Sequence, residues 1–320
     1  MDQSTEILVK PKSHPKHGYK YLFYSSEITF PAGLSDKRAS LASLLAEAEI
    51  TKRIPIVPNF VLDPKHNHGF ELPPNNLLKY ISLERFRSVF PEIITLDEFD
   101  FAAASRKLIN QQTNTLELAG LADVLVERVW PNSIWYRANP EIIDRISTFH
   151  GTGSGSTSGW FLPTQKVREL AAPVLSVLGE DFVGVHLRRG DRMEQIPAMK
   201  RDTSPSRVMQ RVREFVPNPI TIYLSTNETS PKYLNEIKEY GQVVSAASFE
   251  SLKIDELRND NYLLFAVEMY IVGMAKEAFY TFCDSRPWYY SEKPQLYRSL
   301  LPYSQHKQES KWKRVIRKLF

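Results

Sequence analysis

Two adjacent arginines at the end of an apolar stretch are the residues of this sequence best suited to chemistry. Arg188 and Arg189 follow the run 182–187 in the segment VGVHLRRGD. Neighbouring guanidinium groups repel each other unless an anion lies between them. A diphosphate is an anion whose geometry suits two forked donors. Each charge-assisted hydrogen bond to it contributes roughly 1.5 to 3 kcal/mol when water is excluded. The pair predicts a diphosphate site in which Asp191 holds the guanidinium groups in place. The alternative is an internal network in which Asp191 and a second carboxylate neutralise both arginines.

Side-chain alternation along the predicted strand places Gly184, His186 and Arg188 on one face. A histidine within a strand is commonly neutral, with one ring nitrogen donating and the other accepting a hydrogen bond. We therefore expect His186 to support the site, and direct catalysis is the alternative. Ligands of open α/β sheets bind beyond the carboxyl ends of the strands, which is where both arginines lie.

Strands and helices alternate through the second half of the chain, which predicts a wound parallel sheet that positions these residues. Ser204-Pro205 and Ser230-Pro231 are typical helix starts, because serine caps the first turn and proline fits its first position. The predicted strands are 182–187, 220–226, 242–245 and 278–282, and the predicted helices are 163–178, those starting at 205 and 231, and 262–275. Repeated winding of this kind is typical of nucleotide-binding layers.

The first half also alternates, and a flexible segment separates it from the second. The predicted strands are 20–25, 53–60, 92–95 and 133–137, with an amphipathic helix at 35–49, a helix at 83–90 and a mainly helical stretch at 102–128. The run GTGSGSTSG at 151–159 has no side chains that pack a core, and glycine and serine make it flexible. We expect domains at 1–155 and 156–305 and a basic tail at 306–320, with a long surface loop as the alternative interpretation of the run.

The composition excludes some classes of partner. Lys and Arg number 41 against 37 Asp and Glu, a net charge of +4 over 320 residues, too small to indicate nucleic-acid binding. One cysteine, Cys283, excludes an internal disulfide and fits a reducing compartment. No run approaches the roughly 18 apolar residues of a membrane span, and the N-terminus has no apolar core of signal-peptide length. We expect a cytoplasmic protein.

The C-terminal segment KWKRVIRKLF combines five cations with a set of apolar side chains: Trp312, Val315, Ile316, Leu319 and Phe320. An amphipathic helix of this kind can rest on an anionic membrane surface as a peripheral contact. The alternative is a terminal helix that packs on the protein with its cations in water.

The segment VGVHLRRGD resembles the H-x-R-R-x-D signature of the GDP-fucose-dependent fucosyltransferases, which include α1,2-, α1,6-, nodulation and protein O-fucosyltransferases. Thr226-Asn227-Glu228 resembles the family's Thr-Asp-acid turn, and MAKEAFYTFCDSRPW resembles its last motif, an apolar strand followed by a serine-rich turn. The resemblance spans about residues 182–288. It implies an α/β fold of the GT-B architecture, in which two Rossmann-like domains face a cleft and the second domain binds the nucleotide sugar.

The resemblance also implies roles for residues of the second half. Arg188 and Arg189 would hold the GDP pyrophosphate, and Glu268 would recognise guanine through its N1-H and N2-H donors. The other substrate-binding residues that it implies are His186, Asp191, Thr226, Thr281, Asp284 and Ser285. Asp284 stands where the family has the first of two serines, and its charge would repel phosphate unless it points elsewhere.

In the first half, PAGLSDKRASL resembles the family's Gly-rich loop between the first strand and the first helix. Gly33 and Leu34 match that loop, which faces the donor and the acceptor, whereas Asp36 and Lys37 replace its Asn-Gln pair. Lys37 or Arg38, near a helix N-terminus, would add positive charge toward the departing phosphate. A solvated first turn is the alternative.

The sequence predicts neither a metal nor a cofactor. LDPKHNHGFELP has the character of the family's His-Asn loop at the interdomain cleft, which implies that Asn67 binds substrate, and His66 and His68 have no third ligand at metal-binding spacing. The sequence also has no D-x-D dyad to hold a divalent cation, since DEFD at 97–100 indicates a helix start. We expect the arginines to take the place of a metal.

The expected function is the inverting, metal-independent transfer of fucose from GDP-fucose to a hydroxyl of a glycan or protein. Arg188 and Arg189 would stabilise the charge that grows on the leaving GDP, and Glu27 or Asp36 would serve as the base, unless a dissociative path needs none. The alternatives are another nucleotide sugar such as GDP-mannose, and a non-catalytic relative that binds a glycan or a protein.

Overall fold

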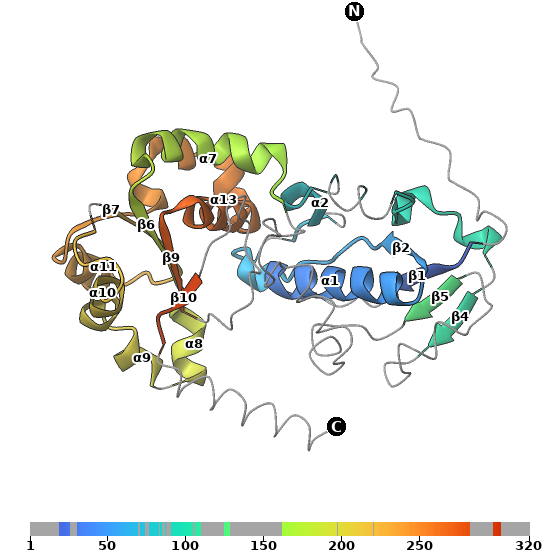
Figure 1. The fold of residues 1–320 in the computed structure, drawn as a ribbon, viewed down its shortest axis with the longest axis horizontal. Coiled ribbons are helices and arrows are strands. Elements are labelled where there is room, and N and C mark those ends of the chain that lie inside the picture. The colour runs from blue at the N-terminus through green and yellow to red at the C-terminus, as the bar shows by residue number, and fades with distance from the viewer. Residues whose placement is uncertain are drawn as a thin grey trace, which may run out of the picture. The chain divides into compact units, whose positions relative to one another are not determined.

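The computed structural model describes residues 19–25, 31–69, 71–73, 77–82, 84, 87, 91–104, 106–109, 125–128, 162–196, 198–219, 221–281 and 297–301. Internal contacts divide the chain into two compact units, Met1–Thr152 and Gly153–Phe320. Each unit contains a five-stranded sheet, and the paired strands of both sheets are parallel (Figure 1). The basic tail at 306–320 lies outside the described residues.

The sheet of the first unit has the order β3-β2-β1-β5-β4. Its strands are β1 (Tyr21–Tyr24), β2 (Ile54–Val57), β3 (Ile94–Thr95), β4 (Arg106–Ile109) and β5 (Leu125–Arg128). Its helices are α1 (Leu34–Ile50), α2 (Leu77–Tyr80) and the 3-10 turns η2 (Pro64–His66), η3 (Leu96–Glu98) and η4 (Phe101–Ala103). The helix predicted at 35–49 is confirmed as α1.

Helix α1 is more enclosed than an amphipathic surface helix. All residues from 40 to 48 are buried, including Glu47, whose carboxylate accepts a 2.6 Å hydrogen bond from the Tyr24 hydroxyl. Because a buried carboxylate needs a partner, this bond explains how a charged residue is accommodated within the helix.

The prediction of a mainly helical stretch at 102–128 is wrong at 106–109 and at 125–128, and residues 105 and 110–124 lie outside the described part of the chain. The stretch contains strands β4 and β5, and β5 lies between β1 and β4 in the sheet. Helix propensity is a weak prior that tertiary context overrides, and pairing with β1 is a long-range contact that a local pattern does not reveal.

The sheet of the second unit has the order β10-β9-β6-β7-β8. Its strands are β6 (Phe182–Leu187), β7 (Thr221–Thr226), β8 (Gln242–Val244), β9 (Glu277–Tyr280) and β10 (Tyr297–Ser299). The chain moves outward from β6 to β8 and then returns to β9 on the other side of β6. This is the strand order of a Rossmann sheet without its sixth strand, and ligands of such sheets bind where the order reverses, here beside β6.

Helices cover both faces of this sheet, as Figure 1 shows for α13 on one face and α10 and α11 on the other. The helices are α7 (Gln165–Leu178), α8 (Gly190–Gln195), α9 (Met199–Asp202), α10 (Pro205–Arg213), α11 (Pro231–Lys238), α12 (Asp255–Asn259), α13 (Asn261–Met274) and the 3-10 turns η5 (Ala246–Ser248) and η6 (Glu250–Leu252). The starts predicted at Pro205 and Pro231 are confirmed.

Alternation along β6 divides its side chains between these two layers. Val183, Val185 and Leu187 belong to the core that α10 and α11 complete. On the other face, a Cβ atom at Gly184 would lie 2.8 Å from the Val272 carbonyl oxygen of α13. Glycine at 184 therefore allows α13 to pack directly on the strand.

Among the helices that the structure describes, none combines the length and the apolar character that a bilayer crossing requires.

Candidate active site

The candidate active site lies at the carboxyl end of β6, where the strand order of the second unit reverses. The main chain leaves β6 after Leu187, passes through Arg188 and Arg189 and enters α8 at Gly190. Strands β9 and β7 flank β6, and each supplies polar side chains to this exit.

Thr281, directly after β9, holds the exit on one side. Its hydroxyl accepts a 2.9 Å hydrogen bond from the Arg188 N–H and donates a 3.1 Å bond to the His186 carbonyl. The Thr281 N–H donates to the same carbonyl at 3.0 Å, and its side chain is completely buried. Thr281 therefore bonds to main chain, whereas the resemblance implies that it lines the ligand.

Strand β7 holds the exit on the other side. The hydroxyl of Thr226 donates a 2.7 Å hydrogen bond to the Leu187 carbonyl and accepts a 3.0 Å bond from the Glu228 N–H. The Asn227 side-chain oxygen accepts from the Arg189 N–H at 2.8 Å. A Cβ atom at Gly190 would lie 2.6 Å from the Asn227 side-chain nitrogen, so glycine leaves the room that this amide occupies.

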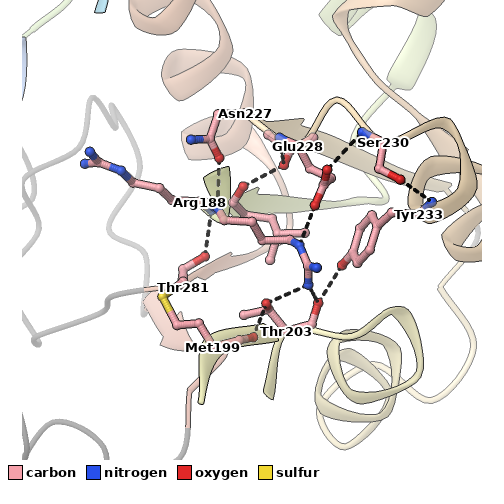
Figure 2. Close-up of polar contacts among 11 residues, drawn as sticks. Arg188, Met199, Thr203, Asn227, Glu228, Ser230, Tyr233 and Thr281 are labelled. Carbon is pink, nitrogen blue, oxygen red and sulfur yellow. Dashed lines mark hydrogen bonds and ion pairs between the residues drawn. The ribbon is translucent and has the colours of Figure 1, made fainter. Parts of the chain in front are cut away.

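Arg189 is the centre of a buried network, whose members Glu228, Thr203 and Tyr233 are labelled in Figure 2. Its Nε donates to the Glu228 carboxylate at 2.7 Å, and its Nη1 donates to the hydroxyl oxygen of Thr203 at 2.8 Å and to the Thr203 carbonyl oxygen. The guanidinium lies 4.0 Å from the centroid of the Tyr233 ring, and the Tyr233 hydroxyl donates to the Thr203 carbonyl at 2.7 Å. Arg189 is 6% exposed, so the protein supplies the partners of this cation.

The electrostatics of Glu228 fit this role. Burial opposes ionisation of the carboxylate, but hydrogen bonds from the Ser230 N–H at 2.9 Å and from Arg189 outweigh it and hold the pKa of Glu228 below its usual value. Glu228 is therefore an internal anion of the kind that one interpretation of the arginine pair required, and it pairs with Arg189. The side chain of Asp191, the other acid of that interpretation, lies outside the described part of the chain.

Arg188 leaves the strand on the other face. Its side chain points away from the network around Arg189 (Figure 2), and its positive charge acts on His186. The two arginines thus have different surroundings, and only Arg188 is directed toward the face shared by Gly184 and His186.

His186 is a neutral, half-buried residue beside Arg188. Burial and then the charge of Arg188 lower the pKa of His186 to about 4. Its ring lies 5.8 Å from the Phe265 ring of α13 and 5.9 Å from the Tyr280 ring of β9, measured between centroids. Near pH 7 the ring contributes packing and a neutral polar edge rather than charge.

Glu268 of α13 lies over β7 on this same face. The register pairs Gly184 with Tyr223 and His186 with Ser225, and the Tyr223 hydroxyl is 3.5 Å from the Glu268 carboxylate. Burial raises the pKa of Glu268 to about 7, against the effect of hydrogen bonds from Ser225 and Tyr223. A modest change in surroundings can therefore switch this carboxyl group between its two protonation states at neutral pH.

The predicted site residues of the first unit gather around the start of α1. Gly33 is the N-cap residue, and a Cβ atom there would lie within 4.0 Å of both the His66 ring and the Asp36 carboxylate. Lys37 and Arg38 are 1% and 0% exposed, so the alternative of a solvated first turn is wrong for these two cations, although Ser35 of the same turn is exposed. The Lys37 ammonium lies 5.9 Å from the centroid of the Phe60 ring.

Two further predicted residues of this unit, Leu34 and Asn67, are buried. The remaining candidates, Glu27, Asp284 and Ser285, lie outside the described residues. Within the described ranges, no group of three or more His, Cys, Asp or Glu side chains could hold a metal ion.

Sequence reasoning missed Thr203 and Tyr233. Thr203 lies just before α10, and Tyr233 lies in the first turn of α11. These helices cover the face of the sheet that Leu187 contacts, and alternation along the strand predicts that Arg189 points to the same face. The sequence therefore carried a signal for the side on which Arg189 lies, although not for its partners.

A scan against protein-family models and a search of curated proteins gave no match. Solved structures do match. A POFUT1 crystal structure in complex with GDP-fucose is 12% identical, with a TM-score of 0.50 over 91% of this chain and 99% of that chain. A second crystal form of that complex is 11% identical, with a TM-score of 0.51 over 87% and 98%.

The fucosyltransferase NodZ from Bradyrhizobium is 13% identical, with a TM-score of 0.48 over 81% of this chain and 88% of that chain. At these identities the POFUT1 matches establish the fold. The chain therefore has an α/β fold of the GDP-fucose fucosyltransferase type.

Proposed function

We propose that this protein transfers fucose from GDP-fucose to an acceptor hydroxyl, and that Arg188 binds the diphosphate of the donor. The observation that carries this proposal is the different placement of the two arginines. Arg189 pairs with Glu228 inside the protein, and the side chain of Arg188 points away from that network at the reversal point of the sheet. Nucleotide phosphates bind at this position in wound α/β sheets.

The proposed reaction breaks the bond between the anomeric carbon of fucose and the β-phosphate oxygen of GDP. The sugar acquires oxocarbenium character while negative charge grows on the departing diphosphate, and the Arg188 guanidinium stabilises that charge without a metal ion. The acceptor oxygen, from a glycan or a protein, attacks the opposite face of the sugar and inverts the anomeric centre. If the reaction uses a protein base, Asp36 or Glu27 accepts the proton of the acceptor hydroxyl; a dissociative path needs no such base.

Glu268 is the proposed guanine-recognition residue. An ionised carboxylate accepts hydrogen bonds from the N1-H and the 2-amino group of guanine, and charge-assisted bonds of this kind are roughly twice as strong as neutral ones. The position of Glu268 on the Arg188 face of the sheet supports this assignment. His186, which packs against Phe265 and Tyr280 and is affected by the charge of Arg188, is the proposed neutral support.

We also propose that the first unit recognises the acceptor, that the second unit binds the donor, and that the two units face each other across a cleft, as in the GT-B architecture. The residues proposed to act from the first unit are Gly33, Leu34, Asp36, Lys37 and Asn67.

The test is the hydrolysis of GDP-fucose, with water as acceptor, compared with the binding of GDP by calorimetry. Arg188→Ala is expected to lower kcat by about 100- to 1000-fold. Arg207→Ala, which removes an exposed arginine of α10, is the matched control and should change neither quantity. Wild-type protein that neither binds GDP nor hydrolyses GDP-fucose would contradict the proposal and favour a non-catalytic binding protein.

Donor identity is tested separately in a thermal-shift panel of GDP, UDP, ADP and their sugars, with and without EDTA. The expected result is stabilisation by GDP and GDP-fucose that EDTA leaves unchanged. Equal or stronger turnover of GDP-mannose would keep the mechanism and change the sugar, whereas stabilisation by UDP alone would remove the guanine role of Glu268.

A further inference from the structure

The exit of β6 is held by side-chain hydroxyls on both sides. The carbonyls of His186 and Leu187 accept from Thr281 and Thr226, and the N–H of Arg188 donates to Thr281. These groups lie at the point where the sheet ends. Buried main-chain groups need partners, and the two threonine hydroxyls supply them together with the Thr281 N–H, which also donates to the His186 carbonyl.

The hydroxyl groups of both threonines are fully used. A threonine hydroxyl has one hydrogen to donate, and Thr281 gives it to the His186 carbonyl while it accepts from Arg188. Thr226 gives its hydrogen to the Leu187 carbonyl and accepts from Glu228. Neither hydroxyl retains a hydrogen with which to bind a phosphate oxygen.

We propose that Thr281 and Thr226 are positioning residues that fix the main chain of Arg188, so that its guanidinium meets the diphosphate in the reactive geometry. This inference rests on the proposed function. A misplacement of about 1 Å can cost about 100-fold in rate, and an arginine side chain magnifies any rotation of its own main chain. Thr281 is the more important of the two, because it alone contacts the Arg188 N–H.

The test compares Thr281→Val, which keeps the shape and removes the hydroxyl, with Thr281→Ser, which keeps the hydroxyl. Thr51→Val is the matched control, because Thr51 is also buried and its hydroxyl donates to the Glu47 carbonyl in the first unit. We expect Thr281→Val to lower kcat for GDP-fucose hydrolysis by about 10- to 100-fold. Thr281→Ser should restore most of that loss, and Thr51→Val should leave kcat unchanged.

Amide hydrogen exchange of the ligand-free protein gives a readout that does not depend on activity. The Arg188 amide is expected to lose protection in Thr281→Val and to keep it in Thr281→Ser. Thr226→Val serves as a second variant if Thr281→Val does not fold, and a smaller loss of kcat is expected for it. Loss of protection together with lower kcat would support the inference.

Two results would overturn it: unchanged protection in Thr281→Val, or lost protection with unchanged kcat. A wild-type protein without GDP binding or GDP-fucose hydrolysis would overturn the proposed function, and with it the catalytic purpose of this arrangement. The exchange measurement would then still decide whether the two hydroxyls hold the main chain.

Discussion

Arg189 and Glu228 form an ion pair of 2.7 Å between side chains that are only 7% and 9% exposed. Removal of one partner from such a pair leaves an uncompensated charge in the interior and is strongly destabilising. The pair also joins the segment after β7 to the residue that follows Arg188, because Glu228 lies two residues beyond the end of β7. Stability and site geometry are therefore coupled at this position.

Glu228→Gln is expected to destabilise the protein by on the order of 3 kcal/mol in urea unfolding. Glutamine can still accept from the Ser230 N–H, so the variant isolates the loss of charge. Adding Arg189→Met should recover part of the stability, because the unpaired cation is then gone. Asp255→Asn, at an exposed pair with Arg258, is the control and should change stability by less than about 0.5 kcal/mol. A similar small effect for Glu228→Gln would contradict the assigned pair.

The lowered pKa of Glu228 gives this effect a pH dependence. A carboxyl group whose folded pKa lies below its unfolded value stabilises the protein above the unfolded pKa, and loses that contribution as pH falls through the folded pKa. The difference in unfolding free energy between wild type and Glu228→Gln should therefore be large near pH 7 and shrink on acidification below about pH 4.5. A difference that stays constant with pH would show that the ionised form is not what matters.

Glu268 is expected to have the opposite effect on stability. Its pKa is raised to about 7 in the folded protein from a usual value of 4.5, so its favourable contribution is present below pH 4.5 and declines as pH rises to 7. Glu268→Gln should therefore raise the stability of the ligand-free protein at pH 8 by roughly 1 to 3 kcal/mol and change it little at pH 4. Glu239→Gln, an exposed glutamate at the end of α11, is the control for a general effect of charge.

Binding of GDP-fucose should follow the ionisation of Glu268. The diphosphate of this ligand is esterified at both ends and keeps its charge between pH 5 and 8, so a pH dependence of its affinity reports on the protein. We expect the Kd to rise by up to about tenfold for each pH unit below 7, and to be weaker but flat in Glu268→Gln. A flat profile in the wild type would argue against guanine recognition by this carboxylate.

Gly184→Ala is expected to destabilise the second unit by about 1 to 3 kcal/mol, because its Cβ would meet the Val272 main chain at 2.8 Å and push α13 from the sheet. Gly33→Ala is the matched control. Its Cβ would lie 3.7 Å or more from its neighbours at an ordinary φ of −67°. Thermal unfolding distinguishes the two, and equal losses would contradict close packing at Gly184.

The sequence was informative where local rules decide the structure. The starts of α10 and α11 follow from Ser-Pro pairs, and the alternation that joins Gly184 to Arg188 also separates Arg188 from Arg189. It was uninformative where a partner comes from elsewhere in the chain. Glu228 lies 39 residues from Arg189, and the strands within 102–128 exist because β5 pairs with β1. The burial of Lys37 also depends on distant parts of the chain, because the segments that surround this residue cannot be identified from the pattern of its own helix.

The hydrogen bonds of Thr281 and Thr226 to the end of β6 have a consequence for engineering the protein. Thr281 holds the Arg188 N–H through its hydroxyl and the neighbouring His186 carbonyl through its hydroxyl and its main-chain N–H. The residues proposed to recognise the acceptor lie in the first unit, whereas both threonines and Arg188 lie in the second, so acceptor preference could be redesigned in the first unit while the hydrogen bonds that hold Arg188 are kept.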